Sequence, residues 1–181
     1  MEGFISKNLL DQNRIISEEK LFFSFQKTLD NIFSKEGKLE KGVFLSHKHT
    51  DKELVYKLIK LFKKHNIDVY IDWLDDDMPI VTNQETALKI KEKIKNSKKF
   101  LLLATDEAIN SKWCNWELGL GDAEKYIENI AIIPVTNSNN GTWLGNEYLQ
   151  IYPALTIDKD KNELFIEFQG EKQSFFSWLN N

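Results

Sequence analysis

The chain has 181 residues, 41% of them hydrophobic and 12% aromatic, which excludes disorder throughout and is enough for one domain with a core. Its formal net charge of −4 argues against nucleic-acid binding through bulk electrostatics, and its single cysteine, Cys114, excludes an internal disulfide and indicates a reducing compartment. Because no apolar run approaches the roughly 18 residues of a membrane span and the N-terminus carries no secretory pattern, we expect a soluble cytoplasmic protein without membrane contact.

The first 40 residues are expected to form an N-terminal helical extension. Residues 17–34 read as one amphipathic helix. Its apolar face is formed by Leu21, Phe22, Phe25, Leu29 and Phe33. Ser17, followed by two glutamates, is typical of a helix start. Something must cover the phenylalanine-rich face, so we expect the extension to pack back on the domain or to mediate oligomerisation.

Beyond the extension, strand and helix patterns alternate. Short apolar runs predict strands at residues 42–46, 68–73, 99–105, 129–135 and 154–157. Helical patterns lie between them, at residues 51–65, 83–94 and 108–126. Asn83 is predicted to cap the second of these helices. An acidic turn begins at Leu74 and ends at Pro79, directly after the second strand.

Strands separated by helical patterns of roughly 10–15 residues predict right-handed crossovers and a parallel sheet. Within the strand at residues 99–105, residues 100–103 are apolar throughout, as expected of a strand covered on both faces. The sequence therefore predicts a doubly wound, flavodoxin-like α/β fold over residues 41–157, a three-layer sandwich with a central parallel sheet of about five strands. Residues 158–181 are expected to add a strand at 164–168 and a helix at 174–179 that pack on the edge of this domain.

In such folds ligands bind beyond the carboxyl ends of the strands. Three stretches are expected there, at residues 46–51, 73–79 and 105–113. The sequence contains no GxGxxG, GxxxxGK[ST] or GxSxG motif, which disfavours a dinucleotide-binding Rossmann domain, an NTPase and a serine hydrolase.

No metal site is predicted. His47 and His49 lack a third histidine or a cysteine, and the aspartates of the acidic turn are more typical of a solvated turn. A phosphorylated-aspartate receiver domain shares the architecture, but the first strand here ends in Leu-Ser-His rather than in an acidic pair.

Residues 111–117, Ser-Lys-Trp-Cys-Asn-Trp-Glu, admit two interpretations. Trp113 and Glu117 share a helical face, where an aromatic ring beside a carboxylate suits a partly cationic ligand with a sugar diol, such as a nicotinamide riboside. Alternatively, apolar residues that step by four and three form a core-facing stripe. The stripe comprises Ile109, Trp113, Trp116, Leu120, Ala123 and Ile127. In that case Trp116 is core, and Glu117 lies just off the stripe, where an exposed carboxylate is unremarkable.

Two glycines, Gly119 and Gly121, lie inside the same predicted helix. Each costs about 1 kcal/mol relative to alanine in a helix interior. Glycine is tolerated there when another group packs closely against the helix backbone. We therefore expect close packing at both positions.

Four segments, in this order, resemble the TIR (Toll/interleukin-1 receptor) domains, and bacterial ones in particular. Val-Phe-Leu-Ser-His at residues 43–47 is similar to the first strand of the family. Residues 68–73 are similar to its second strand, and residues 74–79 to its BB loop. Trp-Cys-Asn-Trp-Glu at residues 113–117 matches the family's W-C-x-x-E signature.

The resemblance covers residues 41–157. A later segment, Gly-Asn-Glu-Tyr-Leu at residues 145–149 followed by Tyr152 and Pro153, is similar to small stand-alone bacterial TIR proteins. Those proteins resemble the TIR partners of Thoeris anti-phage defence systems. The resemblance therefore implies signalling in anti-phage defence, with a separate effector protein that senses the product.

The resemblance also implies cleavage of NAD⁺ between nicotinamide and ribose, with NAD⁺ as substrate and no cofactor. The glutamate of the signature, here Glu117, is the catalytic residue of enzymatic members of the family. Trp113 would stack near the nicotinamide or form the pocket wall. Ser46 and His47 would lie against the phosphate–ribose portion.

Assembly and product are implied in the same way. In the family a neighbouring subunit completes the pocket through the BB loop, which implies self-association through the turn from Leu74 to Pro79, with Trp73 and Asp77 closing the pocket. Attack by water gives ADP-ribose, and attack by a group on the same molecule gives a cyclic ADP-ribose isomer. The alternative function is a non-catalytic scaffold that acts through TIR–TIR assembly, and Glu117 favours catalysis.

Overall fold

The computed structural model describes residues 2–11, 42–64, 67, 69–70, 83–136, 143, 145–158, 160–161 and 163–181. The helix predicted at residues 17–34 lies outside these ranges, as do Trp73 and the acidic turn from Leu74 to Pro79. No helix in the described ranges is long and apolar enough to cross a bilayer.

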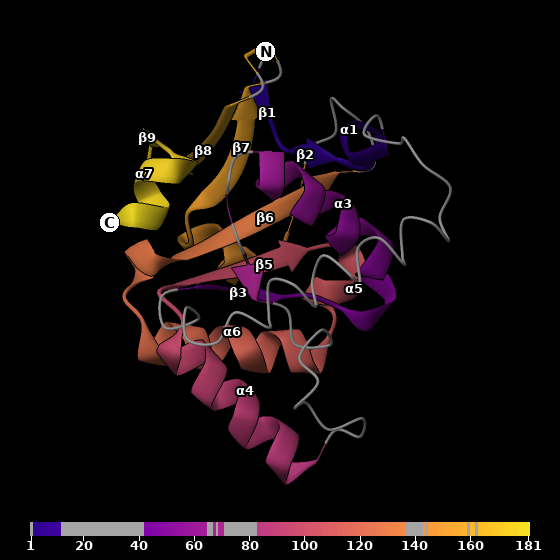
Figure 1. Ribbon diagram of the computed structural model, residues 1–181, viewed down its shortest axis with the longest axis vertical. Coiled ribbons are helices and arrows are strands. Elements are labelled where there is room, and N and C mark those ends of the chain that lie inside the picture. The colour runs from indigo at the N-terminus through magenta and orange to yellow at the C-terminus, as the bar shows by residue number, and fades with distance from the viewer. Residues whose placement is uncertain are drawn as a thin grey trace.

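A central sheet has the strand order β4-β3-β5-β6-β7-β8-β9 (Figure 1). These strands are β3 (Val43–Ser46), β4 (Val69–Tyr70), β5 (Lys99–Ala104), β6 (Ile130–Thr136), β7 (Ala154–Asp158), β8 (Glu163–Phe168) and β9 (Glu171–Ser174). The first five in spatial order pair in parallel, while β8 and β9 add antiparallel pairs beyond β7. The predicted parallel sheet of about five strands is therefore confirmed. β5 is buried at every residue because layers cover both of its faces, which explains its unbroken apolar run.

The N-terminal segment joins the same sheet. β1 (Glu2–Gly3) pairs antiparallel with β7, and β2 (Ile5–Ser6) pairs in parallel with the carboxyl end of β6. β6 pairs with β7 at Ile132, opposite Ala154. The same edge of β6 is therefore open to β2 further along, toward the carboxyl end of β6. The sequence predicts a helical N-terminal extension. In the described part of this extension, two strands come first and are followed by the short helix α1 (Lys7–Asp11). The domain boundary near residue 40 stays a prediction.

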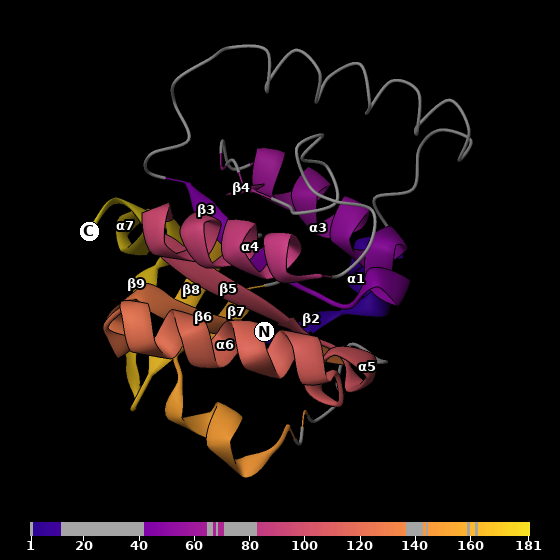
Figure 2. The ribbon, with the colours of Figure 1, turned by 90° about the horizontal axis from the view of Figure 1, so that it is seen from below.

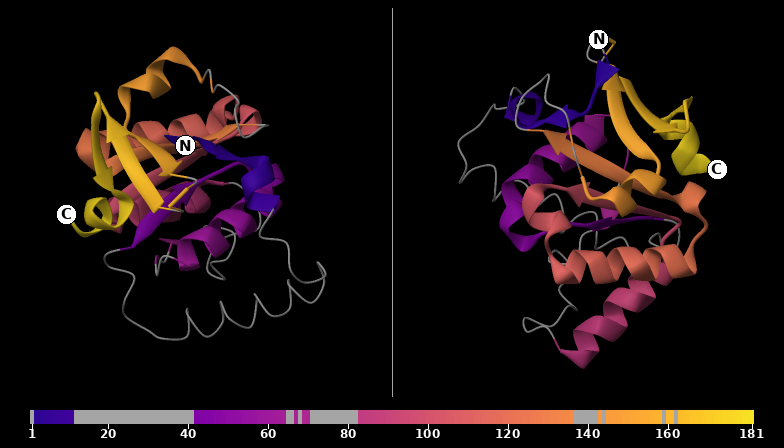
Figure 3. Two further views of the ribbon diagram at one scale, coloured as in Figure 1. Left: turned by 90° about the horizontal axis from the view of Figure 1, so that it is seen from above. Right: turned by 180° about the vertical axis from the view of Figure 1, so that it is seen from behind.

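Helices form the two outer layers. α3 (Lys52–Lys64) and α7 (Phe175–Asn180) pack on one face of the sheet, with α1 against α3. α4 (Gln84–Asn96), α5 (Asp106–Ile109) and α6 (Lys112–Glu124) pack on the other, where α4 lies against α6 (Figure 2). Short 3-10 helices are η2 (His49–Asp51), η4 (Ile127–Asn129) and η5 (Glu147–Ile151). Figure 3 shows β1 and the β8–β9 pair flanking β7 on one side of the three-layer sandwich.

Local capping explains where the helices begin. Asn83 caps α4 as predicted, because its Oδ1 accepts a hydrogen bond from Thr86 N at 3.0 Å. The single helix predicted at residues 108–126 is instead two helices. Thr105 caps α5 by accepting from Ala108 N at 3.1 Å, and Ser111 caps α6 by accepting from Cys114 N at 3.4 Å.

The two glycines of α6 differ in their surroundings, so we expect an alanine substitution to change the stability of the protein differently at each position. A Cβ at Gly121 would lie 3.0 Å from the Phe100 ring, whereas nothing lies within 4 Å of one at Gly119. We expect Gly119→Ala to raise the free energy of unfolding by up to about 1 kcal/mol, the helix-propensity gain. Gly121→Ala should lose that gain to overpacking against the fully buried Phe100 ring. Denaturant unfolding of both variants measures the difference, and equal stabilisation would contradict the close packing at Gly121.

Candidate active site

The face that α6 buries is not the predicted stripe. Its buried residues are Cys114, Glu117, Leu118 and Gly121. Trp113 and Trp116 are half-buried and pack at the margin of the core, and Ala123 is exposed, so the predicted stripe lies at the edge of the buried face rather than on it. The small side chains at 114 and 121 let the helix approach the sheet. The two indoles pack on each other at the edge of that face, with ring centroids 4.7 Å apart.

Glu117 is paired with Ser46 across the interface of helix and sheet. If the predicted stripe faced the core, Glu117 would be exposed. Instead, Glu117 is only 2% exposed, and Ser46 is 1% exposed. Ser46 Oγ donates a hydrogen bond to Glu117 Oε2 at 2.6 Å. Ser46 is the last residue of β3, so the carboxylate lies at the carboxyl end of a central parallel strand. The structure thus joins two of the predicted site residues, which are 71 positions apart in the chain.

The thiol of Cys114 lies close to this pair. Burial is the main cause that raises the pKa of Cys114, and the charge of Glu117 raises it further. Hydrogen bonds with Ser111 and Ser46 act in the opposite direction and do not reverse the shift. A thiol with a raised pKa stays neutral at physiological pH, so Cys114 fills space between helix and strand rather than acting as a thiolate nucleophile.

A second buried carboxylate, that of Asp51, lies at the same end of the sheet and is hydrogen-bonded to the residue that follows β5. Asp51, at the end of η2, accepts a hydrogen bond from Thr105 Oγ1 at 2.5 Å, and both residues are buried. Burial is the largest effect on Asp51 and raises its pKa, while the Thr105 bond opposes it. Thr105 directly follows β5, so residues 46–51 and residues from 105 onward meet, as the crevice prediction requires.

His47 is also buried at this strand end. Its Nδ1 lies 3.0 Å from Leu45 O, and its ring meets the exposed His49 ring edge-on at 6.2 Å. The Leu45 carbonyl can only accept, so Nδ1 carries a hydrogen and the ring is fixed by the backbone. Within the described part of the chain, no group of three or more His, Cys, Asp or Glu residues could hold a metal ion.

An aromatic residue that sequence reasoning missed lies at the carboxyl end of β5. Trp143 Nε1 donates to Ala104 O at 3.1 Å, and the indole packs at the margin of the core that α6 covers. Phe4, between β1 and β2, meets the Trp143 ring in an edge-on geometry at 6.5 Å. Residue 143 lies in a region without strand or helix periodicity, so no sequence pattern indicated its position.

Ser46, His47 and Glu117 lie at the carboxyl end of β3, and Trp113 lies one helical turn before Glu117 on α6. Trp73 and Asp77 lie outside the described residues. Asp51 and Thr105 were within stretches expected at the crevice but were not singled out. The signal that could have found them is that both are short polar residues within stretches that follow a strand.

A family model described as TIR domain matches residues 43–158. A probable 3' cyclic ADP-D-ribose synthase ThsB' of Bacillus cereus (strain MSX-D12) is 28% identical over 193 aligned positions, covering 99% of this chain and 98% of that protein. A probable 2' cyclic ADP-D-ribose synthase TcpO of Methanobrevibacter olleyae is 30% identical over 115 positions, 59% of this chain and 33% of that protein. The matched residues include the parallel strands from β3 to β7, α6 and the Ser46–Glu117 pair, and the chain belongs to the TIR domain family.

Proposed function

We propose that this protein is an NAD⁺ glycohydrolase and ADP-ribosyl cyclase that breaks the bond between nicotinamide and ribose. The observation that carries the proposal is the buried Glu117 carboxylate, held by the Ser46 hydroxyl at the carboxyl end of β3. Relatives named as cyclic ADP-D-ribose synthases, one of them aligned along nearly its full length, support the same reaction class. The products are nicotinamide with ADP-ribose or a cyclic ADP-ribose isomer.

The reaction needs a carboxylate that stabilises positive charge more than it needs a general acid. Nicotinamide leaves as a neutral molecule and takes the bonding electron pair, so no strong general acid is needed. Positive charge then develops on the ribose, as in the oxocarbenium-like transition states of glycoside hydrolysis. A fixed carboxylate in a buried site stabilises that charge, because the low local dielectric strengthens the attraction and no solvent must reorganise. Glu117 would also accept hydrogen bonds from the ribose hydroxyls.

Further parts of the proposal concern residues around the pair and the biological setting. We place Trp113 at the nicotinamide, and Ser46 and His47 toward the phosphate–ribose portion. Trp73 and Asp77 would close the pocket. Self-association through the turn from Leu74 to Pro79 would complete it. The cyclic product would act as a cytoplasmic signal to a separate effector protein in anti-phage defence, as the ThsB' name of the full-length relative suggests.

The test is incubation of the purified protein with NAD⁺, with and without a crowding agent that favours assembly. Nicotinamide release is followed by chromatography, and the second product is identified by mass spectrometry. The proposal requires stoichiometric nicotinamide and either ADP-ribose or a cyclic isomer. Absence of nicotinamide under both conditions would reject the catalytic function and leave a scaffold that acts through TIR–TIR assembly.

Removal of the Ser46 hydroxyl tests whether it positions the carboxylate. We expect Ser46→Ala to lower kcat for nicotinamide release by on the order of 10- to 100-fold, since a hydrogen bond to a charged group contributes about 1.5–3 kcal/mol. KM should change less than kcat, because the main effect of the substitution is on the orientation of Glu117. Ser46→Thr, which restores a hydroxyl, should recover part of the loss. Ser177→Ala, in exposed surroundings on α7, is the matched control. A Ser46→Ala enzyme with unchanged kcat would contradict the positioning role.

A further inference from the structure

The position of Trp143 is fixed from three sides. Its Nε1 donates to Ala104 O at 3.1 Å, which holds the indole against the last residue of β5. The Phe4 ring meets it edge-on, with the planes inclined by 62°. A Cβ at Gly145 would overlap the six-membered ring of Trp143, so the absence of a side chain at residue 145 is what admits the indole. The ring itself is only partly buried, unlike the fully buried aromatic residues of the core.

The strand end to which this indole is bonded lies beside the strand end that carries the Ser46–Glu117 pair. In the pairing of β3 with β5, Ser46 is opposite Leu102, and Ala104 lies two residues further along β5. A strand spacing of about 4.8 Å and a rise of about 3.3 Å per residue put Ser46 and Ala104 roughly 8 Å apart. Leu102 and Ala104 belong to the core on the α6 side, and Trp143 packs against that same core. Glu117 and Trp143 therefore flank one end of the sheet on the same face.

We propose that Trp143 is the platform on which the adenine ring of NAD⁺ stacks, and that this contact selects cyclisation over hydrolysis. The inference rests on the proposed function. A dinucleotide with its nicotinamide ribose at Glu117 and its adenine on Trp143 would be folded, because the strand positions that hold these two side chains, Ser46 and Ala104, lie only about 8 Å apart. The folded form brings the adenosine ribose toward the reacting carbon.

The chemistry that follows is balanced without another reagent. The bond between ribose C1' and the nicotinamide nitrogen breaks, and neutral nicotinamide leaves with the electron pair. A hydroxyl of the adenosine ribose forms the new C–O bond at C1' and releases its proton to solvent. The products are nicotinamide, a cyclic ADP-ribose isomer and a proton. If the adenosine half swings away, water attacks the same carbon and gives linear ADP-ribose, nicotinamide and a proton.

The platform proposal predicts a change in product ratio rather than in total turnover. Stacking of a base on an aromatic side chain contributes enough that Trp143→Ala should lower the ratio of cyclic to linear product on the order of tenfold. Nicotinamide release should change less than the ratio. Trp143→Phe keeps a ring but lacks the bond to Ala104, and should give an intermediate ratio. Gly145→Ala leaves the indole chemically intact but displaces it, and should reproduce the effect of Trp143→Ala.

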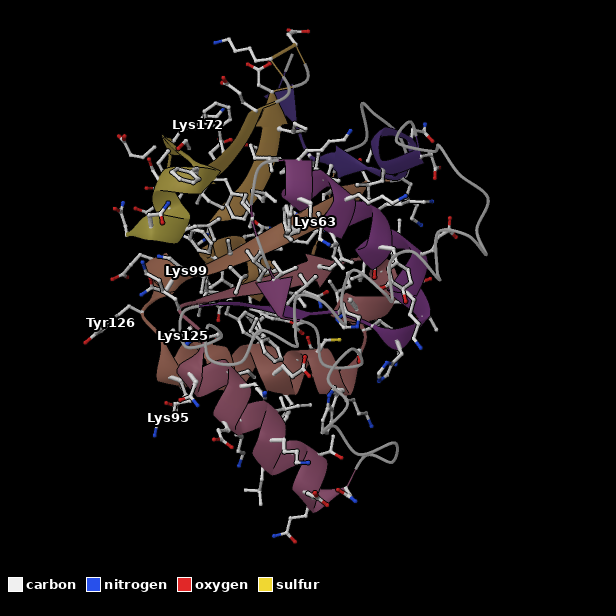
Figure 4. The ribbon with its side chains drawn as sticks, viewed as in Figure 1. Lys63, Lys95, Lys99, Lys125, Tyr126 and Lys172 are labelled. Carbon is white, nitrogen blue, oxygen red and sulfur yellow. The ribbon has the colours of Figure 1, made fainter. Side chains whose placement is uncertain are left out.

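Tyr126 provides the matched aromatic control. It is 77% exposed and, in Figure 4, projects away from the body of the molecule just beyond α6. Tyr126→Ala should keep both the nicotinamide rate and the product ratio of the parent. All variants are compared as full-length protein with NAD⁺, and thermal unfolding shows that each is folded at the assay temperature.

The outcomes separate this inference from the function on which it rests. An unchanged cyclic-to-linear ratio in Trp143→Ala and Gly145→Ala overturns the platform. A parent protein that releases nicotinamide but forms linear ADP-ribose alone overturns it too and leaves nicotinamide release established. A folded Trp143→Phe protein that loses nicotinamide release altogether shows a general catalytic role instead. Absence of nicotinamide release from the parent rejects the proposed function itself.

Discussion

Glu117→Gln is expected to abolish nicotinamide release, with a loss on the order of 10³-fold or more, and to leave the fold intact. Glutamine has nearly the shape of glutamate and keeps an oxygen that can accept the 2.6 Å hydrogen bond from Ser46. What it lacks is the negative charge that would face the developing ribosyl cation. Electrostatic stabilisation of this kind is usually the largest single contribution to catalysis in a buried site. The measurement is the rate of nicotinamide release at saturating NAD⁺.

Glu124 is the matched control, because it lies on the same helix in exposed surroundings near the end of α6. Glu124→Gln should retain the parent rate, and both variants should unfold near the temperature of the parent. If Glu117→Gln kept most of its activity, the chemistry would have to move to another acidic group. Asp51 would then be the next candidate, as the other buried carboxylate within the described part of this strand end.

The parallel sheet could be predicted because burial on both faces leaves a direct signature in the sequence. β5 reads Lys-Phe-Leu-Leu-Leu-Ala and is buried along its whole length, so no polar face interrupts the apolar run. The helices α3 and α4 were visible for the complementary reason, since each has one polar face. The crevice followed from topology, because parallel strands all present their carboxyl ends to the same edge.

Other features left no such signature. β1 and β2 have two residues each, too few to show a period, and they exist because edges of β6 and β7 accept their backbone hydrogen bonds. The orientation of α6 was misread because the tryptophans dominate any hydrophobic pattern. The buried face is instead marked by small residues and by Glu117, whose burial depends on a partner that lies 71 positions earlier in the sequence. A pairing of this kind becomes visible only once the sheet is assembled.

Trp178→Ala should cause the largest loss of stability among the substitutions considered. The indole is 1% exposed, stacks on Phe175 with ring centroids 5.7 Å apart, and donates from Nε1 to Glu128 O at 2.6 Å. Lys99 Nζ lies 4.6 Å from the centre of its ring, at the amino end of β5 beside α7 (Figure 4). Truncation of a buried tryptophan costs about 3–5 kcal/mol, which for a chain of this size lowers the midpoint of thermal unfolding by roughly 10 °C.

The same substitution separates stability from catalysis. Lys99 and Trp178 lie at the amino end of β5, whereas Ala104, Trp143 and the Ser46–Glu117 pair lie toward the carboxyl ends of the strands. Trp178→Ala protein assayed well below its unfolding midpoint should therefore keep the parent kcat. Phe176→Ala on the same helix is the control, because its side chain is 63% exposed and surface changes usually stay within about 0.5 kcal/mol. Equal unfolding midpoints for the two variants would show that α7 does not stabilise the domain through Trp178. A lowered kcat in folded Trp178→Ala protein would show that this end of the sheet affects the active site.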